Sequence, residues 1–220
     1  MSDSSQPVLE LRHASCGALR GLSLRFHAGA LHLITGEPAP QRGALLRVLG
    51  LLDAPESGGV FFEEQNVAAL AEPDRDRIRS ERCGFLFAAP FLLPAFSVVE
   101  NVAMPLFKIS HFTPEQARER TDLLLDFTGL TAEAQQPVDE LTDFQQHAVS
   151  LARALANDPA VITVESLDAL SASDAARFST LLRQTCARFG VAVIASVPAD
   201  FPAGPGDCVI ALDVIGVIPA

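Results

Sequence analysis

Positive charge is scarce in this sequence of 220 residues. Lys108 is its only lysine, and 27 acidic side chains against 16 Lys and Arg leave a net charge of -11. A protein that binds nucleic acid presents clustered positive charge to the phosphates. We therefore expect no nucleic-acid partner, and the bulk charge is also expected to repel free polyphosphates.

Long hydrophobic runs are absent as well. No stretch reaches roughly 18 apolar residues, the length that crosses a bilayer as a helix. The first residues, MSDSSQPVLE, have neither the basic start nor the apolar segment of a secretory signal. Both absences predict a cytoplasmic protein. Hydrophobic residues still make up 49% of the chain, so part of its apolar surface is expected to be buried against a partner.

Metal and redox motifs are missing too. The four cysteines form no C-x-x-C pair, and the five histidines have no metal-ligand spacing. We predict no metal site, buried reduced thiols, and histidines at the surface or in turns. The residues concerned are Cys16, Cys83, Cys186, Cys208, His13, His27, His32, His111 and His147.

Strands and helices alternate along most of the chain. Residues 7–35 have the alternating apolar positions of three short strands, and GALLRVLGLL (43–52) has leucines at helical spacing. The apolar runs AVITVES (160–166) and VAVIASV (191–197) are typical of strands buried on both faces, and an amphipathic helical segment lies between them. This order predicts an α/β fold with a parallel sheet and right-handed crossovers.

The middle of the chain has a different character. The segment PFLLPAF (90–96) is bounded by prolines. TPEQARERTDLLLDFTGL (113–130) opens with a threonine cap, a proline at the first helical position and an acid in the first turn. These features predict an inserted helical subdomain. A further helix within residues 139–159 is expected to lead back into the sheet.

Taken in order, these segments resemble the nucleotide-binding subunit of ABC transporters, in particular the LolD, MacB and FtsE-like branch. The likeness is carried by LLRVLGLLDAPESGGVFF, FLLPAFSVVENVAMPL and QQHAVSLARALANDPAVI, and it covers nearly the whole chain. It implies one ABC-type P-loop NTPase domain over residues 1–220, with a mostly parallel core sheet. The expected parts are an antiparallel β part (7–35 and 56–68), a degenerate P-loop with its helix (36–55), a helical subdomain (91–145) and the second half of the core (146–220).

The phosphate-binding loop of that family corresponds to GEPAPQRG, from Gly36 to Gly43. In the pattern G-x-x-x-x-G-K-[ST], backbone N–H groups surround the phosphates, the lysine neutralises charge and the hydroxyl binds magnesium. Here Gln41 replaces the second glycine, Arg42 the lysine and Gly43 the hydroxyl residue, and two prolines have no N–H to donate. We expect a loop of the right shape without its chemistry, and Arg42 as a surface or salt-bridged residue.

The other chemical positions implied by the resemblance differ as well. Glu165 corresponds to the magnesium-binding aspartate and Ser166 to the glutamate that polarises water, while the Q-loop glutamine and the switch histidine fall on Ala88 and Val197. A serine cannot act as the base, and Glu165 is expected to cap backbone at its strand end. No tyrosine is present to stack on adenine.

The signature motif L-S-G-G-Q, which one subunit lends to its partner's nucleotide, corresponds to LTDFQ. Thr142 keeps a hydroxyl and Gln145 is retained, but Asp143 and Phe144 replace the glycines after Leu141. A carboxylate and a ring are therefore expected where backbone approaches the γ-phosphate. The motif is predicted to be poorly suited to completing a partner's site.

An intact scaffold with changed chemical positions predicts a pseudo-ATPase with no catalytic residue, no metal and no bound MgATP. We expect a structural or regulatory subunit at the cytoplasmic face of the inner membrane, on a permease of the MacB or FtsX kind or opposite an active ABC ATPase as a heterodimer. The docking surface is expected in the proline-bounded loop, where exposure and core packing both stay open. Its residues are Phe91, Leu92, Leu93, Pro94 and Phe96.

Two alternatives to the pseudo-ATPase remain. A divergent ATPase would use Arg42 and Glu165 with a base from elsewhere, such as Asp168. A soluble interaction protein would keep the fold as a platform and leave transport, since a fold does not fix a function. Phosphate release that depends on Arg42 and Glu165 favours the first, and a stable monomer without membrane association favours the second.

Overall fold

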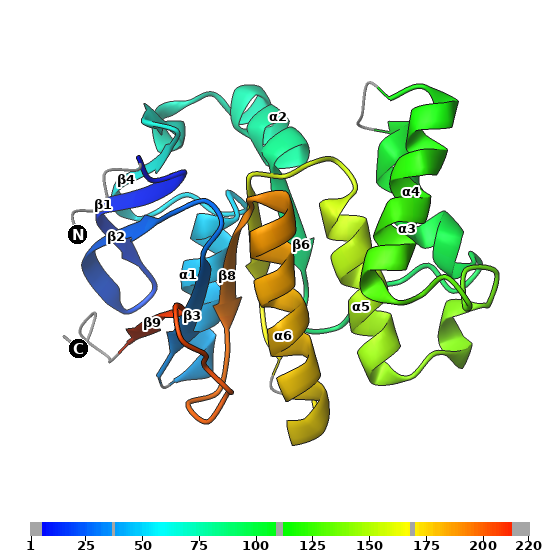
Figure 1. Ribbon diagram of the computed structural model, residues 1–220. Helices are drawn as coiled ribbons and strands as arrows, with labels where there is room; N and C mark the ends of the chain where they lie inside the picture. Colours follow the sequence, from blue (N-terminus) through cyan, green and yellow to red (C-terminus); the bar gives the residue numbers. More distant parts are fainter. Residues whose placement is uncertain (1–5, 37, 109–111, 168–169, 213–220) are drawn as a thin grey trace.

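The computed structural model describes residues 6–36, 38–108, 112–167 and 170–212. An antiparallel sheet, a parallel core sheet and a group of helices follow one another across the molecule (Figure 1). This arrangement confirms the predicted α/β class with its antiparallel and helical parts. Within the described ranges, no helix is both long and apolar enough to cross a membrane.

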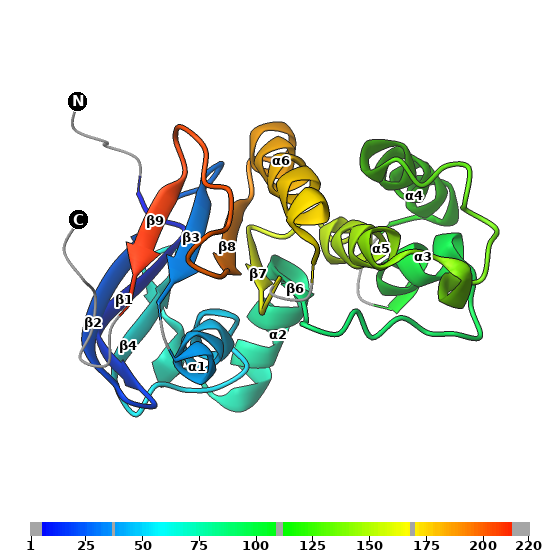
Figure 2. The ribbon, with the colours of Figure 1, turned by 90° about the horizontal axis from the view of Figure 1, so that it is seen from below.

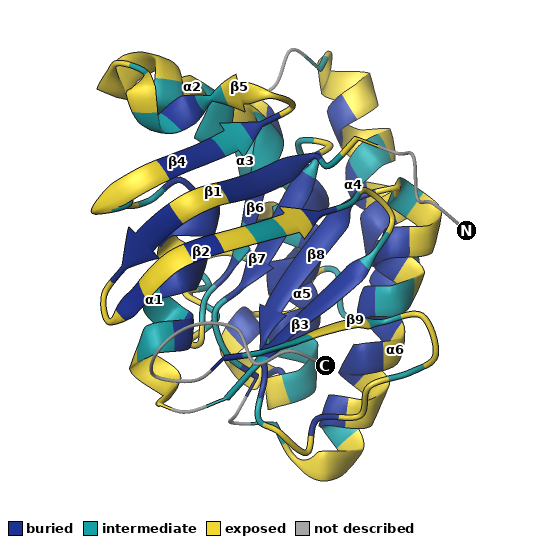
Figure 3. Ribbon diagram, turned by 90° about the vertical axis from the view of Figure 1, so that its left-hand side faces the viewer, coloured by how far each residue is buried: buried dark blue, intermediate teal, exposed yellow. Residues whose placement is uncertain are grey.

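The first sheet is antiparallel, with the strand order β2-β1-β4-β5. Figure 3 shows exposed residues along its outer strand β2 and buried residues along β1. Gly58 is required at the start of β4, because a Cβ there would come within 2.3 Å of the His13 carbonyl oxygen. The strands are β1 (Leu9–Cys16), β2 (Leu19–Phe26), β4 (Ser57–Phe62) and β5 (Gln65–Asn66).

The second sheet is parallel, with the order β6-β7-β8-β3-β9. Segment 31–35 was expected in the antiparallel part, but β3 pairs with β8 and β9 in the core sheet. The polar His32 makes the sequence of β3 look alternating, although the first four residues of this strand are all buried. The strands are β3 (Leu31–Thr35), β6 (Cys83–Leu86), β7 (Val161–Val164), β8 (Ala192–Ser196) and β9 (Cys208–Ala211).

Helices cover both faces of the core sheet (Figure 2). α1 (Ala39–Leu49) packs between the two sheets and buries Leu45 and Leu49 there. α6 (Ala172–Phe189) covers the opposite face, where Phe178 and Leu182 are fully buried. The core therefore has two apolar layers, one on each side of the parallel strands. α2 (Glu72–Arg82) buries no side chain, as its charged sequence predicts.

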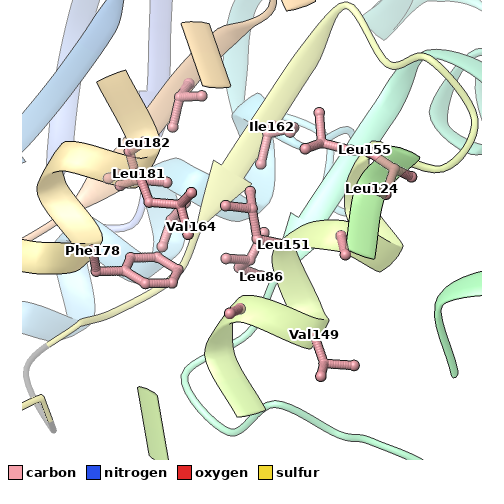
Figure 4. Close-up of a cluster of buried hydrophobic side chains, with 14 of the residues drawn as sticks. Leu86, Leu124, Val149, Leu151, Leu155, Ile162, Val164, Phe178, Leu181 and Leu182 are labelled. Carbon is pink, nitrogen blue, oxygen red and sulfur yellow. The ribbon is translucent and has the colours of Figure 1, made fainter. Parts of the chain in front are cut away.

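The helical part is built from three helices that pack on one another. Thr113 and Gln116 form a capping box at the start of α4, which confirms the predicted threonine cap. α5 reaches the core sheet beside β6 and joins the apolar cluster drawn in Figure 4. The elements are α3 (Val98–Lys108), α4 (Pro114–Thr128) and α5 (Asp143–Leu155), with short 3-10 turns η1 (Val67–Ala69) and η2 (Val138–Glu140).

The four cysteines form no disulfide, and not all of them are buried. Burial raises the pKa of the thiols of Cys16 and Cys186 to about 11, so both stay protonated at neutral pH. Cys83 is half-buried and Cys208 is exposed. The prediction of buried thiols is wrong for Cys208 because β9 forms one edge of the core sheet.

Two histidines that were expected at the surface are buried. His147 lies on α5, with its Nδ1 2.8 Å from the carbonyl oxygen of Asp143. His32 lies in β3 and is only 2% exposed. Its Nε2 accepts a hydrogen bond from the backbone N–H of His27 at 3.1 Å, and its ring meets Phe26 edge-on. Both rings fill core positions that an apolar residue would otherwise take.

The burial of His32 predicts a loss of stability in acid. Burial lowers the pKa of His32 to about 4, whereas an unfolded histidine titrates near 6.5. As the pH falls from about 6.5 toward 4, the unfolded chain takes up a proton that the folded chain does not, so up to about 3 kcal/mol of stability is lost. Urea unfolding of the wild type and a His32→Gln variant at pH 7 and pH 5 measures this. An equal pH dependence in the two proteins would contradict it.

Candidate functional site

The ends of three neighbouring strands form the centre of the candidate site. β7, β8 and β3 are adjacent and parallel, so their carboxyl ends lie side by side at the same end of the core sheet. Ligands of open parallel sheets bind at the carboxyl ends of the strands. Gly36 follows β3, Glu165 follows β7 and Val197 follows β8. The structure thus brings together positions that the sequence separates by more than half of the chain.

The loop after β3 leads into α1 through two prolines. Pro38 is the N-cap residue of α1 and Pro40 lies in its first turn, where the fixed φ of proline suits a helix. The helix therefore begins at Ala39, ahead of the leucine-rich segment that predicted it. The N–H of Gln41 donates to the carbonyl of Pro38 at 3.0 Å. Within the described part of this turn, positions 38, 40 and 41 therefore have no free N–H to offer an anion.

The side chain of Arg42 lies inside the loop. It is 2% exposed, and it is the largest of the fully buried side chains among the described residues. Its Nε donates to the hydroxyl oxygen of Ser196 at 2.9 Å, and its Nη1 donates to the carbonyl of Gly36. The guanidinium therefore joins the ends of β3 and β8. The expectation was a surface or salt-bridged arginine, and the surface position is wrong, because the Ser196 and Gly36 oxygens provide acceptors for a buried guanidinium.

Glu165 ties the ends of β7 and β6 together. Its carboxylate accepts the N–H of Ala88 at 3.1 Å, and its own N–H donates to the carbonyl of Leu86 at 2.8 Å. This is the backbone cap that the sequence predicted. Ser166 follows it and is half-buried, while Asp168, the alternative base, lies outside the described residues. Val197 is fully buried and donates its N–H to the carbonyl of Ile34.

The loop, in this conformation, does not fit the phosphates of a magnesium nucleotide. Arg42 occupies its interior, and Gly43 has no side chain at the position of the family's hydroxyl ligand. The side-chain oxygen of Gln41 is buried without a hydrogen-bond partner among the described residues. That oxygen accepts hydrogen bonds, as phosphate oxygens do, so it cannot donate a hydrogen bond to a phosphate.

The signature region begins α5. The hydroxyl of Thr142 accepts the N–H of Gln145, and the Gln145 side chain accepts the N–H of Thr142, so the two form a capping box. The ring of Phe144 packs edge-on against Phe178 on α6, and the Arg177 guanidinium lies 3.9 Å from its centre. The ring is therefore turned back into the protein. The ring was expected where backbone approaches the γ-phosphate, but it packs on α6 instead, and Thr142 stays exposed at the start of α5. The two remaining motif positions differ in burial, with Leu141 buried and Asp143 exposed.

The proline-bounded loop presents aromatic side chains to solvent. Phe91 is 67% exposed and Phe96 44%, while Leu92 and Leu93 are half-buried and Pro94 is exposed. Large apolar side chains exposed together are typical of interaction surfaces. Of the two alternatives that the sequence left open, exposure therefore holds for the aromatic residues. We call residues 91–96 the docking loop.

A buried amide holds the docking loop in place. Asn101, on α3, is fully buried, and its Oδ1 accepts the N–H of Leu93 at 2.8 Å. Its Nδ2 group lies within hydrogen-bond distance of the carbonyls of Leu93, Phe96 and Ser97, at 3.0 to 3.2 Å. The sequence analysis missed this residue. A lone amide in the apolar segment VVENVAMPL was the available signal.

Arg153 anchors the start of the docking loop from α5. Its two terminal nitrogens donate to the carbonyls of Pro90 and Phe91 at 2.8 and 2.9 Å. Burial lowers the pKa of Arg153 from its usual value, and the two carbonyl oxygens accept hydrogen bonds from its guanidinium. Arg153 was not predicted either, because its partners lie about 60 residues away. The loop is therefore fixed from two helices.

A cavity of about 700 Å³ adjoins the docking loop between α3 and α4. Phe96, Met104 and Phe107 provide much of its apolar lining. Glu100 also lines the cavity, and hydrogen bonds from the backbone N–H and hydroxyl of Ser97 hold the pKa of that carboxyl below its usual range. A cavity lined by apolar side chains together with charged ones is suited to an amphipathic helix.

Comparison with known proteins identifies the family. The family model described as ABC transporter matches residues 19–165, more than half of the chain. The chain belongs to the ABC transporter family. Its fold is that of the family's nucleotide-binding domain, the cassette. The lipoprotein-releasing system ATP-binding protein LolD of Hyphomonas neptunium is 36% identical to this cassette over 169 residues, 73% of this chain and 74% of that protein.

Other LolD relatives confirm the branch. That of Saccharophagus degradans is 32% identical over 177 residues, 80% of this cassette and 77% of that protein. LolD 1 of Chlorobium chlorochromatii is 36% identical over 157 residues, 70% of this cassette and 64% of that protein. The cassette thus spans slightly less than two thirds of this last relative. The resemblance to the lipoprotein-release branch is confirmed.

Solved cassettes share the fold along nearly the whole chain. The ATP-binding cassette MJ0796, in a dimeric post-hydrolysis state bound to ADP and Pi, has a TM-score of 0.79 and 25% identity, covering 95% of this cassette and 96% of that chain. The structure of cbiO1 from Clostridium perfringens has a TM-score of 0.86 at 20% identity, covering 98% of this cassette and 88% of that chain. This second likeness concerns the fold alone.

The relatives correct the prediction of a pseudo-ATPase that takes no cofactor. They are named ATP-binding proteins, and the MJ0796 cassette is described with ADP and Pi bound. The prediction is wrong because it treated each lost phosphate-loop residue as decisive. An arginine can also bind phosphate, and the N-terminus of a helix favours an anion whichever side chains surround it. Changes at a few loop positions therefore do not exclude a nucleotide.

Proposed function

We propose that this chain is the ATP-binding subunit of a membrane transporter of the lipoprotein-releasing kind. In this proposal it lies at the cytoplasmic face of the inner membrane, bound to a permease of the MacB or FtsX kind. Its kinship with LolD proteins supports the transporter class. The observation that carries the proposal is the docking loop, with Phe91 and Phe96 exposed beside an apolar cavity.

The geometry of the docking loop supports a protein partner. Burying an exposed phenylalanine contributes about 1.5 to 3 kcal/mol, so Phe91 and Phe96 together could provide much of the energy of a specific contact. Asn101 and Arg153 fix the loop, so little ordering is needed on binding. We propose that a short amphipathic helix of the permease fills the cavity between α3 and α4. Residues 91–145 would then be the docking module.

We also propose that the cassette works as one of a pair. The relative MJ0796 forms a dimer, which supports a pair of cassettes here as well. Thr142 and Asp143 are exposed at the N-terminus of α5, where a helix favours an anion. The turned-back ring of Phe144 leaves this helix end accessible. Whether the second cassette is a copy of this chain or a paralogue is decided by the proteins that purify with it.

Permease binding is tested by changing the two exposed rings. A Phe91→Ser, Phe96→Ser double variant is expected to recover at least tenfold less permease from solubilised native membranes, because both rings lose their apolar contact. Val209→Ser is the matched control, since Val209 is also an exposed apolar residue, 51% exposed, but lies on β9. The permease is identified by mass spectrometry. Equal recovery with the double variant and the wild type would overturn the docking surface.

A further inference from the structure

We infer that the Arg42 guanidinium closes the phosphate loop from within and competes with nucleotide for it. Arg42 is thus a determinant of nucleotide affinity that acts by occupying the loop. The inference rests on the proposed function, because it presupposes that the chain binds ATP. Three features of the loop carry it.

The first feature is the fork of hydrogen bonds. Nε of Arg42 donates to the Ser196 hydroxyl at 2.9 Å and Nη1 donates to the Gly36 carbonyl. One planar group thus bridges the ends of two neighbouring strands. Both bonds involve a charged donor, and the bond to Ser196 is buried while the bond to Gly36 is partly buried, which strengthens them relative to bonds in water. The guanidinium is held in one orientation, away from the surface.

The second feature is the packing on the other side of Gly36. The N–H of Leu212 donates to the carbonyl of Thr35 at 2.9 Å. A Cβ built on Gly36 would lie 2.1 Å from the Leu212 carbonyl oxygen, so backbone covers that side of the glycine. Gly36 has φ of +108 and cannot be displaced toward Leu212. Space for a phosphate must therefore come from the side that Arg42 fills.

The third feature is a shortage of other donors among the described residues of the loop. Pro38 and Pro40 have no N–H, and the N–H of Gln41 is bonded to the Pro38 carbonyl. Gly43 leaves open space, since a Cβ there would meet no atom of the described residues within 4 Å. A phosphate can enter beside Gly43 only when the guanidinium releases Ser196 and Gly36. Each released bond lowers the apparent affinity by the free energy of that bond.

The test measures MgATP affinity by calorimetry in four full-length proteins. Arg42→Lys keeps the charge but has no planar fork, so it cannot bridge Ser196 and Gly36 and is expected to bind MgATP about tenfold tighter or more than the wild type. Ser196→Ala removes one acceptor and is expected to tighten binding severalfold. Arg47→Lys is the matched control, because Arg47 lies on the same helix but pairs with Asp53 at the surface. It is expected to bind as the wild type does. Thermal unfolding verifies that all four proteins are folded.

The outcomes separate this inference from the proposed function. Tighter binding by both Arg42→Lys and Ser196→Ala supports it. If the wild type binds MgATP and Arg42→Lys binds equally or more weakly, Arg42 is a phosphate ligand or a bystander; the inference then falls while the proposed function stands. If none of the folded proteins binds MgATP, the proposed function falls and the inference falls with it.

Discussion

Replacing Asn101 by alanine is expected to lower the free energy of unfolding by about 3 kcal/mol. Asn101 is fully buried, and its amide serves one N–H and three carbonyls in residues 93–97. Alanine would leave these backbone groups without their partner, and each buried unsatisfied group costs about 1 to 3 kcal/mol unless water replaces it. Urea unfolding at pH 7 measures the loss.

The same variant tests whether a fixed loop is needed for docking. Asn101→Ala is expected to raise hydrogen exchange of residues 91–97 and to reduce permease recovery, although Phe91 and Phe96 are unchanged. Asn157→Ala is the control, because the side-chain oxygen of Asn157 is buried but has no hydrogen-bond partner among the described residues. It is expected to cost less stability and to leave the docking loop protected. A loss in Asn101→Ala no larger than in this control would refute the role of Asn101.

Truncation of Phe178 is expected to have the largest effect on stability. Phe178 is fully buried on α6, and its ring meets those of Phe144 and His147 edge-on at 6.1 and 6.0 Å. Figure 4 shows it in the apolar cluster that joins α6, α5 and the core sheet. Phe178→Ala removes this contact area and leaves a cavity, so about 3 to 5 kcal/mol of stability is lost. Thermal and urea unfolding both report this change.

The control for Phe178 is a phenylalanine that buries little. Phe107, on α3, is 70% exposed, and Phe107→Ala is expected to change stability by no more than about 0.5 kcal/mol. Phe178→Leu, which keeps part of the apolar volume, is expected to lie between the two alanine variants. Similar losses at positions 178 and 107 would mean that the cluster around Phe178 does not hold the helical part to the core sheet.

Local patterns in the sequence predict much of the fold. The continuous apolar runs identify β7 and β8, and the threonine followed by proline identifies the start of α4. The sequence does not reveal that β3 belongs to the core sheet, because its neighbours β8 and β9 lie far along the chain. β9 was missed altogether. Its four residues, CVIA, form an apolar run that is short, and in the structure they are exposed or half-buried.

The candidate site is predictable in position but not in its contacts. The resemblance locates the loop at residues 36–43 and Glu165 at a strand end, where the structure has them. The burial of Arg42 depends on Ser196, 154 residues away, and no local pattern contains that contact. The absence of a lysine and a hydroxyl led to the wrong prediction that no nucleotide binds, because a list of residues omits the remaining donors and the dipole of the helix.

The position of β3 between β8 and β9 in the core sheet has a consequence for synthesis of the chain on the ribosome. Leu31 pairs with Val193 and His32 with Cys208, so the strand leaves the ribosome long before either neighbour exists. Until then its apolar side chains have no sheet to join, and long-range parallel pairing is slow even in a complete chain. The nascent N-terminal half therefore has to be shielded from aggregation until the last quarter of the chain has been made.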